Sequence, residues 1–258
     1  MSVVTIAQIS DCHLFKDKTG SHYGQNVFTN LQRVLHQLAQ LKPLDAVVFT
    51  GDLTQDHSVE SYQHFNHLVN EANLNCPLYY LAGNHDDIEL LNQELLNQEL
   101  NNDVIKADKA VFFSHWRLLL TQSKSDTPAG YVDDEHLAAI ARGNRSDLHT
   151  LLFMHHHPVD VGYFIDKHGL RNQAQFWQAV QQNHTIKAIC CGHIHRGDTY
   201  FFPGFNHLPV LSCPATSIQF DPHMTTVSAL DIGPGYRILQ LGDDGNIESS
   251  LHYLDVGS

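Results

Sequence analysis

The segment that decides the fold is VVTIAQISDCH, residues 3–13, an apolar run that ends abruptly in two side chains able to bind a metal ion. Its first seven residues are typical of a buried strand, and Asp11 and His13 follow directly. An amphipathic pattern over residues 27–41 predicts a helix, and residues 45–50, rich in β-branched side chains, predict a second strand. This βαβ order indicates an α/β fold.

The same pattern, a buried strand followed by polar side chains, recurs four more times. The repeats are Phe49-Thr50-Gly51-Asp52, Leu81-Ala82-Gly83-Asn84-His85-Asp86, Met154-His155-His156-His157-Pro158 and Cys191-Gly192-His193-Ile194-His195. In α/β sheets the carboxyl ends of the strands share one edge, where functional sites collect. We therefore expect all five loops to build one site, with the glycines allowing sharp exits from the strands.

The residue types at these strand ends favour metal binding. Buried carboxylates and imidazoles without a cation would carry a heavy desolvation cost. Carboxylate, imidazole and amide ligands without thiolate suit iron, manganese or zinc, and argue against a structural zinc site of the cysteine type. Histidine, with 20 residues, also outnumbers the 15 lysines and arginines combined.

Composition excludes several classes of function. The net charge of −13, with no basic stripe, argues against a nucleic-acid partner. No stretch approaches 18 consecutive apolar residues, which argues against a membrane protein. The five cysteines lack CxxC spacing and the N-terminus lacks a signal sequence, so we expect reduced thiols, a cytoplasmic location and a single domain spanning residues 1–258.

Further patterns complete the expected order of elements. We expect helices at residues 58–73, with Ser58 as N-cap, 133–142 and 172–183, and strands at 78–82, 111–114, 117–122, 150–154 and 186–191. The tandem LLNQE within residues 89–102 indicates a duplicated surface helix. From about residue 197 the pattern becomes all-β, with short segments at 236–241 and 247–254, and we expect this part to pack as the second sheet.

The five strand ends together resemble the calcineurin-like metallophosphoesterase superfamily. The order of SDCHLF, TGDLTQD, SYQHF, GNHD, HHHP, KHGLRN, CGHIH, IQFDPH and GPGYR narrows this to the bacterial class III 3′,5′-cyclic-AMP phosphodiesterases, over nearly the whole chain. The resemblance implies a four-layer α/β/β/α sandwich of two mixed sheets flanked by helices. It also implies two metal ions, iron with iron or manganese, or zinc, and leaves a homodimer open. The implied metal ligands are Asp11, His13, Asp52, Asn84, His156, His193 and His195.

The resemblance also implies how the ligands are divided between the two ions. One ion is bound by Asp11, His13, Asp52 and His195, and the other by Asp52, Asn84, His156 and His193. Asp52 would bridge them. His156 is selected from the His155–His157 triplet because it lies two residues before Pro158, and its neighbours could compete with it.

The expected reaction is hydrolysis of a phosphodiester, with cyclic AMP giving 5′-AMP. A water shared by the two ions would attack the phosphorus as hydroxide. His85, next to Asn84, is the expected general acid, although a purely structural role is the alternative. Either Asp56 or Asp86 could orient it.

His13, Asn84 and His85 are also expected to contact the substrate. Arg171 could do so from the KHGLRN segment, because an arginine fork suits phosphate oxygens. Asn172 could contact the substrate or cap the following helix. His22, Tyr23 and Asn26 could face the nucleotide, while N-capping by Asn26 needs no substrate.

Three alternatives remain open from the sequence. The same chemistry could act on glycerophosphodiesters, on 2′,3′-cyclic nucleotides or on phosphomonoesters. The chain could be a non-catalytic scaffold, although it retains every ligand and His85. It could be a structural metalloprotein, for which the neutral Asn84 would be a poor ligand.

Overall fold

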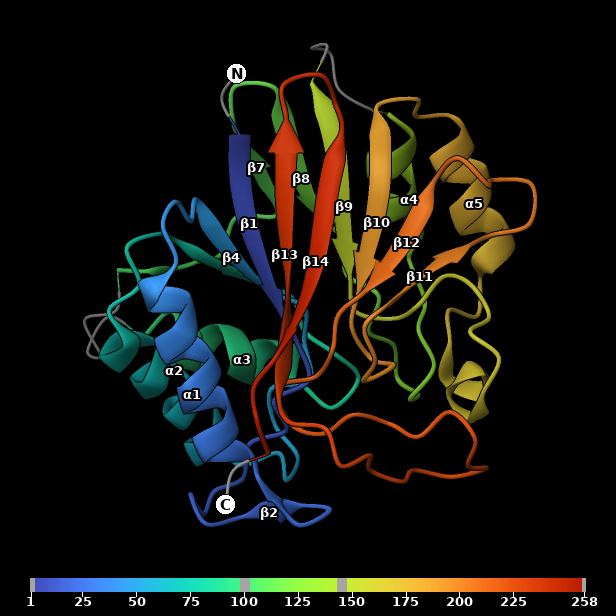
Figure 1. Ribbon diagram of the computed structural model, residues 1–258. Helices are drawn as coiled ribbons and strands as arrows, with labels where there is room; N and C mark the ends of the chain where they lie inside the picture. Colours follow the sequence, from blue (N-terminus) through green and yellow to red (C-terminus); the bar gives the residue numbers. More distant parts are fainter. Residues whose placement is uncertain (1–2, 98–102, 143–147, 257–258) are drawn as a thin grey trace.

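The computed structural model describes residues 3–97, 103–142 and 148–256. Two six-stranded mixed sheets face each other, and helices cover their outer sides (Figure 1). This confirms the expected four-layer α/β/β/α sandwich. A short two-stranded ribbon, Ser21–His22 (β2) and Gln25–Asn26 (β3), lies apart from both sheets.

The first sheet has the order β14-β13-β1-β4-β5-β6. Strands β1, β4, β5 and β6 run parallel, and β13 pairs antiparallel with β1 and with β14. The bounds are Val3–Ile9 (β1), Ala46–Phe49 (β4), Leu78–Tyr80 (β5), Ile105–Lys106 (β6), Gly235–Gly242 (β13) and Ile247–Tyr253 (β14).

The second sheet has the order β11-β12-β10-β9-β8-β7. Its four central strands, β12, β10, β9 and β8, are parallel, and antiparallel strands form both edges. The bounds are Ala110–Phe112 (β7), Trp116–Leu120 (β8), His149–Met154 (β9), Ile186–Cys191 (β10), Asp198–Phe201 (β11) and Pro209–Ser212 (β12).

Strand β1 shows why the apolar runs are continuous. Its Ile6 points into the core between the two sheets, while Ala7 and Ile9 point into the core beneath the helices of the first sheet. Both faces of the strand are therefore buried, as in other sheets covered on both sides.

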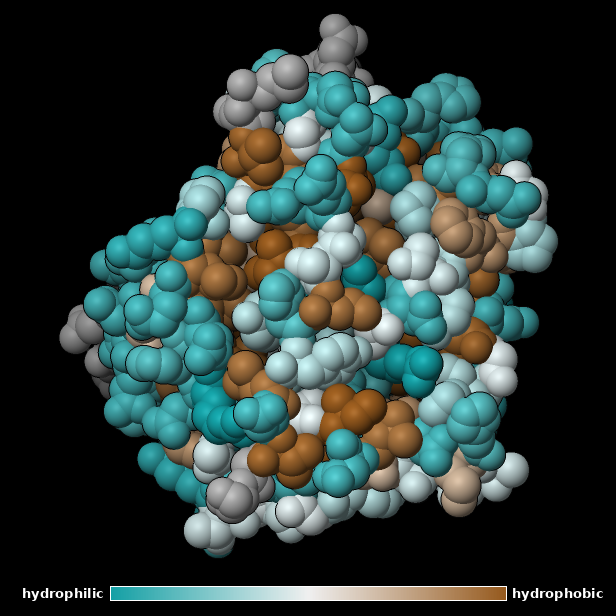
Figure 2. All heavy atoms as spheres, in the orientation of Figure 1, coloured by the Kyte–Doolittle hydropathy of each residue, from teal (hydrophilic) through white to brown (hydrophobic). Residues whose placement is uncertain are grey.

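Helices α1 (Val27–Gln40), α2 (Val59–Ala72) and α3 (Ile88–Leu95) cover the first sheet, and α4 (Asp134–Ala141) and α5 (Gln173–Gln181) cover the second. The Asn26 side chain accepts a hydrogen bond from the Thr29 N–H at the start of α1, and Ser58 accepts one from Ser61 at the start of α2. The outward side of α1 and α2 carries mainly hydrophilic residues (Figure 2), as expected for amphipathic helices packed on a sheet.

The LLNQE duplication is only partly described. Its first copy lies on α3, where Leu91 is buried, and the second begins with buried Leu95 and exposed Leu96. The expected surface helix over 89–102 thus ends earlier within the described residues, and positions 98–102 lie outside them.

The strands after residue 197 correct one expectation. They do not form the second sheet by themselves: β11 and β12 extend the sheet that already holds β7–β10, whereas β13 and β14 join the first sheet beside β1 (Figure 1). The reason is that β1 is apolar on both faces and has a free edge, which β13 covers in a six-residue antiparallel register. Across the described ranges, no helix is both long and apolar enough to span a bilayer.

Candidate metal centre and substrate pocket

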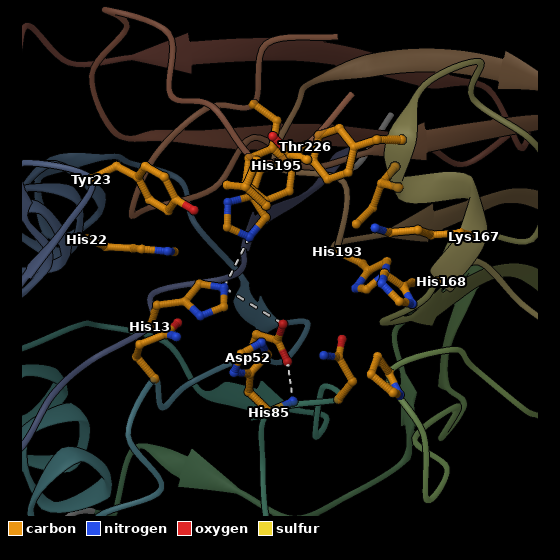
Figure 3. A pocket seen from close by; sticks show the side chains of 17 residues that line it. His13, His22, Tyr23, Asp52, His85, Lys167, His168, His193, His195 and Thr226 are labelled. Atoms are coloured by element: carbon orange, nitrogen blue, oxygen red, sulfur yellow. Dashed lines mark hydrogen bonds and ion pairs between the residues drawn. The ribbon is translucent and has the colours of Figure 1, made fainter. Parts of the chain in front are cut away.

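The strand ends of both sheets meet at one cavity. The loops after β1, β4 and β5 of the first sheet and after β10 of the second line it, and its volume is about 520 Å³. His13, Asp52, His85, His193 and His195 surround the space (Figure 3). Asn84 also lines it, and Asp11 lies fully buried next to them. The structure therefore brings together residues that are far apart in the sequence.

The backbone at these positions is unusual. Asp11, His13, Asp52, His193 and His195 all have φ between 48° and 68°, in the left-handed region that non-glycine residues seldom adopt. Such conformations persist where surrounding structure fixes them, and they cluster at functional sites. Here each aims a side chain at a common centre.

One glycine shows how closely the loops approach. A Cβ added at Gly83 would lie 2.2 Å from Asp52 Oδ1. The loops after β4 and β5 can be this close only because Gly83 has no side chain. The same approach lets the His85 N–H donate to Asp52 Oδ1 at 2.8 Å.

One group of candidate ligands combines Asp11, His13 and His195. His195 Nδ1 lies 3.0 Å from the Ile218 carbonyl, which can only accept, so this nitrogen carries the hydrogen of the neutral ring. His195 Nε2 then presents its lone pair 3.0 Å from His13 Nε2 and 3.5 Å from Asp11 Oδ1. The Asp11 carboxylate is held in place by the His193 N–H at 3.0 Å.

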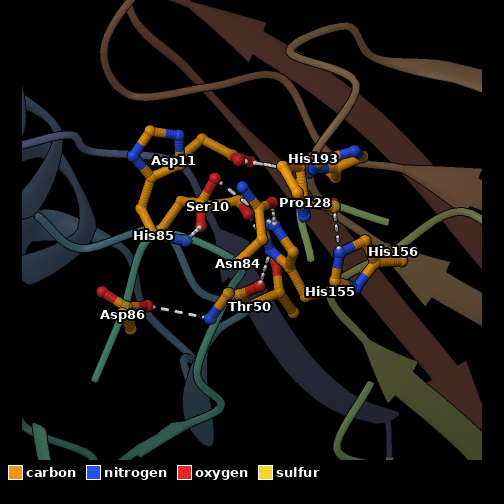
Figure 4. Close-up of polar contacts among 12 residues, drawn as sticks. Ser10, Asp11, Thr50, Asn84, His85, Asp86, Pro128, His155, His156 and His193 are labelled. Carbon is orange, nitrogen blue, oxygen red and sulfur yellow. Dashed lines mark hydrogen bonds and ion pairs between the residues drawn. The ribbon is translucent and has the colours of Figure 1, made fainter. Parts of the chain in front are cut away.

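A second group forms around His155. Its Nδ1 lies 2.7 Å from the Thr50 carbonyl, which directs Nε2 toward Asn84 Oδ1 at 3.1 Å and Asp52 Oδ2 at 3.4 Å (Figure 4). The His193 ring lies beside it, with its Nε2 buried and without a hydrogen-bond partner. Oxygen and nitrogen acceptors that face one another in a buried space require a cation or a proton between them.

The predicted ligand His156 has different surroundings. Its Nδ1 contacts Ser123 Oγ at 2.9 Å and its Nε2 contacts the Pro128 carbonyl at 3.2 Å (Figure 4). His156 is fully buried and its ring packs against His193, but both ring nitrogens already have protein partners. The geometry thus favours His155 over His156 as the residue of the triplet that faces Asp52 and Asn84.

The charges in this centre are strongly coupled. Burial, together with the negative charge of Asp52, raises the pKa of Asp11 to about 7. Burial opposes a charge on His155, but the attraction of Asp52 outweighs it and raises the pKa of His155 to about 9. Burial would raise the pKa of Asp52, yet His155 holds it well below its usual range. In the absence of a metal ion, a proton on His155 supplies the positive charge.

His85 lines the pocket, and within the described residues neither Asp56 nor Asp86 makes a hydrogen bond to its ring. Asp86 accepts backbone N–H groups of Leu53, Thr54 and Gly83, and the Asp56 carboxylate is occupied by Lys16 and Ser58. Instead, His57 Nδ1 lies 2.9 Å from the His85 carbonyl, and the two rings are nearly parallel.

The two residues expected from the KHGLRN segment lie away from the pocket. Arg171 is exposed and its guanidinium lies over the Tyr131 ring. Asn172 is the N-cap residue of α5, but its side chain makes no capping hydrogen bond and does not line the pocket. Its side-chain oxygen accepts the Val132 N–H, and its side-chain nitrogen donates to the Val132 carbonyl. Of the hairpin residues, His22 and Tyr23 line the pocket and Asn26 caps α1.

Sequence reasoning missed the first two residues of that segment and the residues just before it. A short 3₁₀ helix, Phe164–His168 (η2), places Phe164, Ile165, Lys167 and His168 in the pocket wall. The only signal in the sequence is the aromatic and basic run YFIDKH, which no metal motif includes.

Two relatives of known name match this chain over nearly all of its length. A probable cyclic nucleotide phosphodiesterase of Colwellia psychrerythraea is 46% identical over 96% of this chain and 94% of the relative. The 3′,5′-cyclic adenosine monophosphate phosphodiesterase CpdA of Escherichia coli K12 is 34% identical over 97% of this chain and 90% of the relative.

Solved structures share the fold at low sequence identity. A dimetal phosphatase from Danio rerio has a TM-score of 0.64 at 14% identity, covering 96% of this chain and 98% of the other. A purple acid phosphatase from yellow lupin has a TM-score of 0.65 at 14% identity, covering 98% of this chain and 52% of the other.

The family match extends over residues 4–197, which contain all five strand ends. Together with the two relatives above 30% identity, this match fixes the family: the chain belongs to the calcineurin-like phosphoesterases.

Proposed function

We propose that this protein hydrolyses 3′,5′-cyclic nucleotides, with cyclic AMP giving 5′-AMP, at a centre of two metal ions. The proposed ligands come from both sheets. They are Asp11, His13, Asp52, Asn84, His155, His193 and His195, with His155 in the place that the sequence pattern assigned to His156.

The observation that carries the proposal is the convergence of buried acceptors on one space. Asp52 Oδ2 lies 3.4 Å from His155 Nε2 and 3.7 Å from His13 Nε2, so it faces both groups of candidate ligands. A carboxylate in this position fits a ligand shared by two ions. The donor set of oxygen and imidazole nitrogen without thiolate supports iron, manganese or zinc.

Bound metal ions would stabilise the negative charge on the phosphoryl oxygens and would lower the pKa of the attacking water. The side chains perform the remaining steps. In the hydrolysis, a water oxygen bonds to phosphorus, the bond from phosphorus to O3′ breaks, and O3′ takes up a proton.

His85 is the proposed donor of that proton. Its ring lies in the pocket wall beside His13, at 4.9 Å between centroids, and its backbone N–H is fixed on Asp52. The His57 contact to its carbonyl holds the loop from the other side. A positioned imidazole contributes typically about 10²–10⁴-fold to such a reaction.

The names of the relatives support a cyclic nucleotide as substrate, and the pocket of about 520 Å³ accommodates a ligand of nucleotide size. The decisive experiment loads the protein with iron, manganese or zinc. It then compares turnover of cyclic AMP, cyclic GMP, a 2′,3′-cyclic nucleotide and a glycerophosphodiester. We expect the 3′,5′-cyclic nucleotides to be preferred; turnover of the glycerophosphodiester with none of cyclic AMP would refute the proposed substrate.

The five cysteines are all free and buried, which supports a reducing compartment, and we place the reaction in the cytoplasm. The homodimer stays a prediction that sedimentation equilibrium tests directly.

A further inference from the structure

The walls of the pocket differ in chemistry. Its floor consists of the candidate metal ligands, whereas part of its wall is apolar, formed by Phe164 and Ile165 of η2 and by Phe220. In the proposed reaction the metal ligands of the floor bind the phosphate group. The bond-breaking step therefore leaves the apolar wall without an assigned role. A nucleotide, however, also carries a base that needs an apolar face.

The apolar wall begins at a proposed metal ligand and runs outward. The Phe220 ring lies parallel to the His195 ring, 4.0 Å between centroids and 3° between planes. The Phe164 ring follows at 5.3 Å from Phe220. A packed cluster that includes buried Ile165, Ile194 and Ile218 supports both phenylalanines. The wall is therefore packed from behind and directly continuous with the proposed metal centre.

The opposite side of the pocket offers a different surface. His22 and Tyr23 lie there, across the centre from Lys167 and His168 (Figure 3). The His22 ring packs on His13 at 5.1 Å, and Tyr23 is 55% exposed at the tip of the hairpin. This side is polar and open, so a base placed there would remain in contact with water.

Lys167 adds a hydrogen-bond donor to the apolar side. Its Nζ lies 6.0 Å from the centroid of the Phe164 ring, and the side chain extends toward the centre of the pocket (Figure 3). Purine bases present acceptor atoms on one edge, N7 in adenine and both N7 and O6 in guanine. An ammonium group beside an aromatic ring can donate to this edge while the ring covers the face of the base.

We propose that η2 forms the nucleobase subsite, with Phe164 packing against the face of the base and Lys167 donating a hydrogen bond to its edge. The inference rests on the proposed cyclic nucleotide activity and adds to it the residues that hold the base. Phe220 is a positioning residue in this scheme, because it joins Phe164 to His195.

The test compares two substrates in the metal-loaded enzyme. One is cyclic AMP, and the other is the cyclic phosphate of 1,3-propanediol, which keeps a six-membered cyclic diester and lacks ribose and base. We expect Phe164→Ala to lower the ratio of the two kcat/KM values, cyclic AMP over the baseless diester, by about tenfold. The loss should appear mainly in KM, and Phe164→Trp should restore the ratio. Lys167→Met should lower it by a few-fold.

Controls separate folding from recognition. Phe112→Ala removes a phenylalanine that is 61% exposed on β7, away from the pocket, and should leave the ratio unchanged. Metal content and thermal unfolding report whether each variant folds. An unchanged ratio in Phe164→Ala, or a lowered ratio in Tyr23→Ala, overturns the subsite, and an unchanged ratio in Lys167→Met overturns the role of Lys167. If the wild-type enzyme hydrolyses the baseless diester and not cyclic AMP, the proposed function itself fails.

Discussion

The carboxyl group of Asp11 links metal binding to stability. Its pKa in the folded, metal-free protein is raised to about 7 by burial, from 3.8 in the unfolded chain. Between about pH 4 and pH 7 the folded state therefore holds a proton that the unfolded state lacks. The contribution of Asp11 to the free energy of unfolding of the metal-free protein must fall as the pH rises through that window, by about 1.4 kcal/mol per unit of pKa difference.

We expect Asp11→Asn to remove this loss, because asparagine has no charge to bury and its Oδ1 can still accept the His193 N–H. The metal-free variant should be more stable than metal-free wild type at pH 8, by about 2–4 kcal/mol, while its metal affinity is lost. Urea unfolding from pH 4 to pH 8 measures this. Asp134→Asn, on an exposed position of α4, should keep the wild-type pH slope. A destabilised Asp11→Asn protein at pH 8 would contradict the argument.

His155 and His156 give a second test at the residue scale. His155→Ala removes the imidazole that faces Asp52 and Asn84, so we expect it to lose about one of two metal ions and most of the activity. His156→Asn removes contacts with Ser123 and the Pro128 carbonyl, which should lower stability by about 1–3 kcal/mol while both ions remain. Elemental analysis of the purified variants decides between them, and metal loss confined to His156→Asn would restore the original assignment.

The choice within the triplet shows what a motif leaves undetermined. Spacing from Pro158 selected His156, but the direction of each side chain depends on where β9 ends, and a shift of one residue turns a side chain to the other face. The strand ends at Met154, and His155 is the residue that reaches the Thr50 carbonyl. The other six expected ligands needed no such choice, since none of them stands in a run of identical side chains.

At the scale of elements, Arg237 of β13 ties the two sheets together. It is 2% exposed, and its guanidinium donates to the carbonyls of Ser212 on β12 and Asp198 on β11. Two of these bonds reach the Ser212 carbonyl at 3.0 and 2.8 Å. The positive charge of Arg237 is thus shared among backbone carbonyls at the junction of the two sheets.

We expect Arg237→Ala to lower the free energy of unfolding by about 3 kcal/mol or more, because buried carbonyls lose a charged donor. Arg237→Lys should lower it less, since one ammonium group cannot reproduce the planar fork. The matched control is Arg142→Ala at the exposed C-terminal end of α4, expected to change stability by no more than about 0.5 kcal/mol. Urea denaturation compares all three variants. Equal stability of Arg237→Ala and wild type would show that the hydrogen bonds of Arg237 across the two sheets do not stabilise the protein.

The positions of most helices and strands could be predicted from the sequence, but the pairing of the last four strands could not. Strand β1 has the expected bounds, and α2 begins after the expected cap Ser58. Local patterns carry this information, because burial fixes the periodicity and capping fixes the helix start. Pairing of the last four strands depends on which sheet edges are free, and both β1 and β10 are apolar strands that could accept a neighbour. No local pattern distinguishes the two edges.

At the scale of the whole molecule, the proposed metal centre joins the two sheets. Asp11, His13, Asp52 and Asn84 follow strands of the first sheet, whereas His155, His193 and His195 follow β9 and β10 of the second. Between the sheets, the apolar core supplies most of the contact, but at this end the facing groups are carboxylates and imidazoles. Without metal ions, this end of the interface must be held by protons and a few hydrogen bonds.

We therefore expect removal of the metal ions to lower the stability of the entire molecule and to make it depend on pH. A ligand that binds only the folded state stabilises it by about 4 kcal/mol at a free concentration 1,000 times its Kd. The lowered pKa values of His13, His193 and His195 make metal-free stability rise with pH below about pH 6.5, which opposes the contribution of Asp11 there. Above about pH 6.5 the raised pKa values of Asp11 and His155 remain, so metal-free stability should decrease from about pH 6.5 toward pH 9, and metal binding should release protons and tighten over that range. Thermal unfolding with and without a chelator, across that pH range, measures both effects. Added manganese should restore the midpoint of thermal unfolding in the wild-type protein and should not restore it in His155→Ala. This pair of results would show that the stabilisation comes from metal bound at the proposed centre. A midpoint that the chelator leaves unchanged at every pH would show that the two sheets do not depend on a metal ion to stay together.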